Sequence, residues 1–263
     1  MIKLTRFLLW GALLIVMSAA CATTEYDTAK RKAIAEDNRR LGDAYIRQGD
    51  YTRALRYYLE AAEHYADDPQ LQYSLGLAYQ EKGNYTRAVE HFQNALELEP
   101  DMAPAKNSLG VAYIKAGDYD KAIATLKQMI EERGYEIYMT PQYPKYNLGW
   151  AYYQKRQYRE SEHYLQQALD YYVTGIPKDA IYIKALRAMG LNALAQSEPQ
   201  KALSFLEKAQ ALAPKWADLY LDMGRAYRLA GDRLKAKEAY QRVMELAPST
   251  EIADTAAREA AAL

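Results

Sequence analysis

Apolar and small residues recur every three or four positions between Tyr73 and Pro100, which is the spacing of one face of an α-helix. Two such runs are separated by a polar turn at Gly83 and Asn84. Pro100 ends the second run, because proline cannot donate the next hydrogen bond of a helix. The stretch therefore predicts two helices joined by one tight turn.

The same pattern recurs along the chain with a nearly constant period. A Leu-Gly or Met-Gly pair lies in the first helix of each copy, with the glycines at Gly42, Gly76, Gly110, Gly149, Gly190 and Gly224. Successive glycines are 34, 34, 39, 41 and 34 residues apart. Sixteen residues after each glycine the chain carries a large side chain, at Tyr58, Phe92, Leu126, Leu165, Leu206 and Tyr240. A period of this length indicates helix pairs that bury their apolar faces against their neighbours.

These positions together resemble the tetratricopeptide repeat. The resemblance implies an all-α fold, a right-handed α-solenoid of six repeats over residues 35–250, with a C-terminal capping helix at 251–263. The six repeats are expected at residues 35–68, 69–102, 103–141, 142–182, 183–216 and 217–250. Repeat 4 departs from the pattern at its turn, where Arg156 replaces glycine, and repeat 5 departs at Ala193 and Ser197.

Two intervals exceed 34 residues, and both insertions flank repeat 4. The extra residues lie within 133–144 and around 170–179, where Gly134, Pro141, Pro144, Gly175 and Pro177 predict loops. Surface loops without a function and a locally widened groove are the two interpretations that the sequence leaves open.

Residues 1–20 predict a signal peptide rather than a folded element. Lys3 and Arg6 precede the apolar run at residues 7–17, and small residues follow it. Residues 17–21 resemble the lipobox of bacterial lipoproteins, although Ser18 is less typical than leucine at its position. The resemblance implies that the signal is cut before Cys21 and that Cys21 is lipidated. An ordinary secretory signal followed by a chance cysteine is the alternative.

Residues 22–30 are largely polar or small, and residues 21–34 are predicted to comprise the lipidated Cys21 and a short tether between the lipid anchor and the repeats. In enteric bacteria, aspartate after the lipidated cysteine retains a lipoprotein at the inner membrane, and this chain has Ala22 there. The resemblance therefore implies a lipid anchor in the outer membrane, with the repeats facing the periplasm. Because Cys21 is the single cysteine, an intramolecular disulfide is excluded.

Charge and motifs argue against several classes of function. Lys and Arg number 34 and Asp and Glu also number 34, so no basic excess favours nucleic acid binding. The three histidines lie in different repeats, at His64, His91 and His163, which argues against a metal site. No metalloprotease, P-loop or serine-hydrolase motif occurs. We therefore expect a scaffold rather than an enzyme, with no cofactor and no small-molecule substrate.

In tetratricopeptide-repeat proteins the first helix of each repeat lines the concave surface. The corresponding residues here are apolar and aromatic at the centre and charged at the ends. The residues predicted to bind a partner are Tyr73, Leu77, Asn107, Val111, Ile114, Tyr146, Trp150, Tyr153, Arg187, Leu191 and Leu194. Partial cover of this surface by the solenoid's own superhelix is the alternative.

An aromatic trio lies at the centre of this predicted surface. Tyr146, Trp150 and Tyr153 share one helix face at spacings of four and three, and are expected to point into the groove. Chaperone-type members of the family hold a peptide carboxylate with lysine and asparagine, which this chain does not match. An amphipathic helix or an apolar protein segment is therefore the expected partner.

The lipobox, the short tether and six repeats together resemble the type IV pilus biogenesis lipoproteins of the pilotin type. Residues 138–141 leading to 147–149 also look like that family's longer link between middle repeats. The resemblance implies an outer-membrane scaffold that helps an outer-membrane secretin reach the membrane or form its ring, with the secretin or a pilus assembly component as partner. An adaptor for cell-wall enzymes and an outer-membrane protein assembly subunit are the alternatives.

Overall fold

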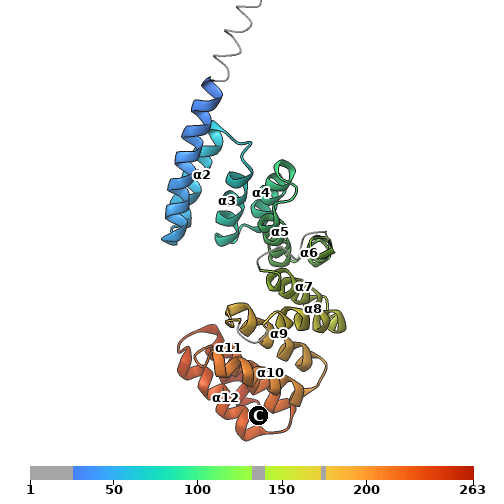
Figure 1. Cartoon of the computed structure of the whole chain (residues 1–263). Helices are drawn as coiled ribbons and strands as arrows, with labels where there is room; N and C mark the ends of the chain where they lie inside the picture. Colours follow the sequence, from blue (N-terminus) through green and yellow to red (C-terminus); the bar gives the residue numbers. More distant parts are fainter. Residues whose placement is uncertain (1–25, 132–139, 173–175) are drawn as a thin grey trace, which may run out of the picture. The chain divides into compact units, whose positions relative to one another are not determined.

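The computed structural model describes residues 26–131, 140–172 and 176–263, and within these ranges it contains helices and no strand (Figure 1). This confirms the predicted all-α fold. The signal peptide, Cys21, and residues 133–139 and 173–175 of the two insertions lie outside the described residues. None of the described helices is long and apolar enough to cross a membrane.

The helices follow one another in pairs along the chain. They comprise a first helix at 26–47, α2 Tyr51–His64, α3 Pro69–Glu81, α4 Tyr85–Leu98, α5 Ala103–Ala116, α6 Tyr119–Glu131, α7 Gln142–Gln154, α8 Tyr158–Asp170, α9 Ala180–Ala195, α10 Pro199–Leu212, α11 Ala217–Leu229, α12 Arg233–Leu246 and α13 Glu251–Ala261. The most extensive contacts join α3 to α4, α7 to α8, α9 to α10 and α11 to α12. The chain divides into an N-terminal unit, residues 1–112, and a C-terminal unit, residues 113–263.

The structure corrects the predicted tether. Residues 26–34 are helical and continue into the first helix of repeat 1, instead of forming an irregular link. The segment contains no glycine or proline, and alanine, lysine and arginine favour a helix. Residues 26–33 are all exposed, which explains why their polar composition looks like that of a linker. Any irregular tether is therefore limited to residues that the structure does not describe.

The predicted loop before repeat 4 is also partly wrong. Gln142, Tyr143 and Pro144 form the first turn of α7. Proline is tolerated there, because the N–H groups of a first turn have no partner within the helix. Residues 132–139 of this predicted loop lie outside the described part of the chain.

The tight turn within each repeat places one residue in the left-handed conformation. Gly83 has a φ of 75°, and the side chain of Asn84 then accepts the Arg87 N–H and caps α4. Arg156 and Ser197 occupy the same position in repeats 4 and 5, with φ of 60° and 61°. The turn is therefore preserved in both repeats, although a residue other than glycine is strained there by roughly 1–2 kcal/mol.

The large side chain sixteen residues after each glycine is buried in every repeat, at Tyr58, Phe92, Leu126, Leu165, Leu206 and Tyr240. A Cβ atom at Gly76 would lie 2.5 Å from the Phe92 ring, and one at Gly224 would lie 2.4 Å from the Tyr240 ring. Only glycine permits so close an approach of the two helices. The repeated positions therefore form the core, as predicted.

In the C-terminal unit the first helices of the repeats contact one another. Helix α7 contacts α9, α9 contacts α11, and α11 contacts α13, whereas the described residues show no such contact among α8, α10 and α12. The first helices are therefore closer together and form the inner face of the unit, and the second helices form its outer face. Helix α13 covers the last repeat by packing Ala256 against Ala236, Tyr240 and Val243, as expected of a capping helix.

Candidate functional site

The inner face of the C-terminal unit begins with the aromatic residues of α7. The rings of Trp150 and Tyr153 stack with their centroids 5.1 Å apart, and both side chains are partly exposed. Tyr146 and Trp150 also pack against the buried residues Ala188 and Met189 of α9. Burial raises the pKa of Tyr146 to about 12. The trio thus borders the inner face, but Tyr146 and Trp150 also hold repeats 4 and 5 together.

Helix α9 contributes the next row of this face. Leu191 is partly exposed, and Leu194 packs against the core formed around Leu206 and Ala209. Arg187 lies one turn before Leu191 and joins a network of charged side chains from the last two repeats. Leu191 and Arg187 are therefore predicted α9 residues that remain partly accessible to a partner.

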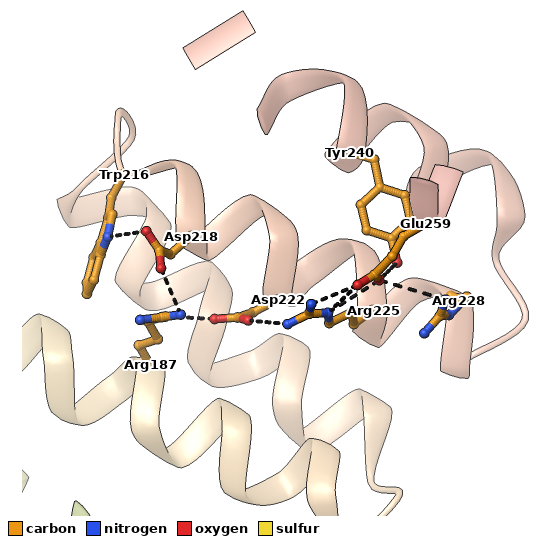
Figure 2. Close-up of polar contacts among 8 residues, drawn as sticks. All are labelled: Arg187, Trp216, Asp218, Asp222, Arg225, Arg228, Tyr240 and Glu259. Atoms are coloured by element: carbon orange, nitrogen blue, oxygen red, sulfur yellow. Dashed lines mark hydrogen bonds and ion pairs between the residues drawn. The ribbon is translucent and has the colours of Figure 1, made fainter. Parts of the chain in front are cut away.

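Arg187 is held by three side chains that come from α11 or directly precede it (Figure 2). Its Nε donates to Asp222 Oδ2 at 2.7 Å, and its Nη2 pairs with Asp218 Oδ1 at 3.1 Å. Its guanidinium lies 5.1 Å from the centre of the Trp216 ring, and Trp216 Nε1 donates to Asp218 Oδ2 at 3.0 Å. The orientation of Arg187 is therefore fixed before any partner arrives.

Arg225 extends the network toward the end of the chain (Figure 2). Its Nη2 donates to Glu259 Oε1 at 2.7 Å, and its Nη1 lies 3.6 Å from Asp222 Oδ1. The Tyr240 hydroxyl donates to Glu259 Oε2 at 2.9 Å, and Arg228 Nη1 lies 3.7 Å from the same oxygen. The network thereby links α9, α11, α12 and the capping helix α13.

The two central carboxylates lie in different environments. Asp222 is 1% exposed, and its burial raises its pKa, against the opposing effect of Arg187 and Arg225. Burial also acts to raise the pKa of Glu259, but hydrogen bonds from Arg225 and Tyr240 outweigh it and hold that pKa below its ordinary value. Both carboxylates depend on the arginines around them to be charged within the protein.

Sequence reasoning found Arg187 but missed two carboxylates of the network, Asp222 and Glu259. Asp222 lies two residues before Gly224, outside the positions expected to line the groove, and Glu259 lies in a helix interpreted as a cover. One signal was available, because Asp222 and Arg225 are three residues apart and share a helix face. Nothing in the sequence connects Arg225 to Glu259, 34 residues away.

The remaining predicted residues lie in or next to the N-terminal unit. Tyr73 packs against Ala95, Met102 and Ala105 and therefore contributes to the core between repeats 2 and 3. Leu77, Asn107 and Val111 are partly exposed. Ile114, at the start of the C-terminal unit, is only 9% exposed, so little of its side chain is available to a partner. An apolar side chain at a groove position can equally turn into the core, and here it does.

The described residues contain no group of three or more histidine, cysteine or acidic side chains that could hold a metal ion. The inner face carries aromatic rings, guanidinium groups and carboxylates. Such groups suit contact with another protein chain.

Family models confirm the repeat assignment. Models described as tetratricopeptide repeat match residues 39–92, 79–134, 144–215 and 217–250. The chain belongs to the tetratricopeptide-repeat family. Its fold is that of a scaffold or adaptor that binds other proteins.

Two solved structures share this fold over nearly their whole length. PilW, a widely conserved type IV pilus biogenesis factor, is 19% identical with a TM-score of 0.73, and the match covers 84% of this chain and 97% of PilW. PilF of Pseudomonas aeruginosa is 17% identical with a TM-score of 0.68, and the match covers 88% of this chain and 99% of PilF. At these identities the likeness shows the fold alone.

A curated relative matches a shorter segment. The chain is 35% identical over 82 residues to the probable UDP-N-acetylglucosamine–peptide N-acetylglucosaminyltransferase SPINDLY of Hordeum vulgare. The match covers 31% of this chain and 9% of SPINDLY. It therefore concerns a small part of that enzyme.

Proposed function

We propose that the chain is a lipoprotein scaffold that assists type IV pilus biogenesis. In this proposal Cys21 carries a lipid anchor in the outer membrane, and the repeats face the periplasm. The inner face binds an outer-membrane secretin or another pilus assembly component and promotes its localisation or its assembly into multimers. The protein acts by binding and not by catalysis.

The observation that carries the proposal is the extent of the likeness to PilW and PilF. The matches span 97% and 99% of those proteins, so the likeness extends over nearly the whole of each. Many repeat proteins share individual repeats, whereas agreement over a whole array is more restrictive. The lipobox-like segment before the repeats supports the same assignment, because it suggests a protein of the bacterial envelope.

The proposal is tested by deleting the gene in a piliated strain of the source bacterium. Detergent-resistant secretin multimers and surface pili are expected to fall sharply, while secretin monomer is still made. Restoration by the wild-type gene is the control. Normal multimers in the deletion strain would contradict the proposal and favour an adaptor for cell-wall enzymes.

A further inference from the structure

The charged network on the inner face of the C-terminal unit exposes its cations more than its central anions. The side chains of Arg187, Arg225 and Arg228 are 23%, 37% and 46% exposed, whereas those of Asp222 and Glu259 are 1% and 19% exposed. The guanidinium groups therefore offer more accessible surface to a partner on this face than the two central carboxylates do.

Two further side chains adjust this charge distribution. Lys184 lies on α9 one turn before Arg187 and is exposed. Asp218 is the accessible acidic residue of the network, with 42% of its side chain exposed, and it already pairs with Arg187. The accessible charge of this surface is therefore positive overall, although the mature chain is close to neutral.

The guanidinium groups are also held in place. Arg187 has two carboxylate partners and lies over the Trp216 ring, and Arg225 is bound by both oxygens of Glu259. A partner carboxylate that meets these groups does not have to order two long flexible side chains. Arginine also presents N–H groups in a planar fork that suits carboxylates.

The aromatic residues of α7 lie next to these cations. Helix α7 contacts α9, the helix that carries Arg187, and Trp150 packs against a core cluster that includes Ala188 and Met189 of α9. Burial raises the pKa of the Tyr153 hydroxyl, and Arg187 and Arg225 oppose that shift. The Trp150–Tyr153 stack therefore borders the arginine row within the same unit. The surface combines an aromatic strip with an adjacent positive strip.

We propose that this surface binds a protein segment that carries acidic residues beside large apolar residues. The inference rests on the proposed function insofar as that function requires a protein partner on the inner face. The acidic side chains pair with Arg187, Arg225 and Arg228, and the apolar ones cover Trp150 and Tyr153. A basic segment is disfavoured, because Asp222 and Glu259 are less exposed than the arginines with which they pair.

The test is a selection of random 16-residue peptides, displayed on phage, against the purified full-length chain. Enriched peptides are expected to combine at least two Asp or Glu residues with Trp, Phe or Leu. Synthetic versions are then measured by fluorescence anisotropy. Replacing their acidic residues with Gln is expected to weaken binding at least tenfold, and affinity is expected to fall as NaCl is raised.

Substitutions at Arg228, and a matched control substitution at Arg242, locate the site. Arg228→Glu is expected to weaken binding of the acidic peptides at least tenfold, and Arg228→Gln severalfold. Arg242→Glu on the outer helix α12 is the control, because Arg242 has nearly the same exposure, 45%, and also pairs with a glutamate. Unfolding midpoints of all variants establish that each is folded. The Gln variant keeps the test valid if the Glu variant is unstable.

Basic or uncharged peptides, no enriched peptide, or acidic peptides that bind Arg228→Gln and wild type equally would each overturn this inference. These outcomes leave the pilus proposal intact, because that proposal is decided by secretin multimers in the deletion strain. Conversely, normal multimers together with acidic peptide binding would refute the pilus proposal and retain the inference about the surface.

Discussion

At the residue scale, the helix pairs of repeats 1, 2, 4, 5 and 6 each depend on a glycine that faces a large buried side chain. In repeat 2 the Phe92 ring occupies the space where a Cβ atom of Gly76 would lie. Both residues are fully enclosed, so neither the ring nor the helix has free space into which it could move. The stability of the pair should therefore respond to a single added methyl group.

Gly76→Ala is predicted to destabilise the protein by about 1–3 kcal/mol, because a core this tight does not accept additional volume without strain. The unfolding midpoint measured by circular dichroism is expected to fall. Thr86→Ala, an exposed change on helix α4, is the control and should leave the midpoint nearly unchanged. Equal midpoints for Gly76→Ala and wild type would show that the two helices are not in close contact.

At the element scale, the capping helix α13 does more than cover apolar residues. It places Glu259 against Arg225, Arg228 and Tyr240, so an ionic contact joins it to the inner face. Its apolar contacts with the last repeat come from Ile252, Ala256 and Ala260, two of which are alanines that bury little apolar area. The carboxylate of Glu259 is therefore expected to contribute substantially to the docking of α13.

Glu259→Gln is predicted to destabilise the protein by about 1–3 kcal/mol at pH 7, the range for hydrogen bonds to charged groups. The folded-state pKa of Glu259 is lowered, so its contribution is complete above the ordinary carboxyl range. It is lost as the pH falls through the lowered value. Urea unfolding at pH 7 and near pH 3 should therefore show a difference from wild type that shrinks in acid.

The control for this prediction is Glu245→Gln on α12, where the carboxylate forms an exposed pair with Arg242. Exposed pairs of this kind contribute roughly 0–1 kcal/mol. A difference between Glu259→Gln and wild type that is equally large at both pH values would mean that charge is not what docks α13.

The helices and their core positions could be predicted from the sequence, because they depend on local periodicity. Phe92 and Tyr240 are buried where the repeat places them. Prediction was less accurate for the remaining side chains, because the sequence does not show which side of the solenoid each one faces. Ile114 is buried and Trp150 packs partly on α9, because the rotation of a helix within the stack decides these contacts and spacing alone does not.

The ion pairs of the inner face could not be predicted from the sequence for a related reason. Arg225 and Glu259 meet across a distance along the chain that no local pattern connects. For residues 26–34 the composition was ambiguous, because a polar segment suits both a tether and an exposed helix. There the local helix preference, and not burial, decides the outcome.

At the scale of the whole molecule, the proposed function needs both the anchor and the repeats. Cys21→Ser is predicted to abolish lipidation, because the chain contains no other cysteine. Metabolic labelling with a palmitate analogue should label the wild-type protein and not the variant. The variant should also be uncut or leave the membrane fraction on salt washing. Label retained by Cys21→Ser would contradict the proposed anchor.

The central claim is that the inner face of the C-terminal unit promotes secretin assembly. Leu191, partly exposed on α9, and Leu234, 70% exposed on the outer helix α12, offer a matched pair of substitutions. Each is changed to glutamate and expressed in the deletion strain, with protein level and unfolding midpoint as checks on folding.

The decisive measurement is the amount of detergent-resistant secretin multimer in these two strains. The account predicts that Leu234→Glu restores multimers to the wild-type level and that Leu191→Glu restores less than a tenth of them. A charge buried against an apolar partner surface is expected to weaken binding at least tenfold, which corresponds to about 1.4 kcal/mol. Full restoration by Leu191→Glu, in a strain where the deletion itself abolishes multimers, would contradict the account.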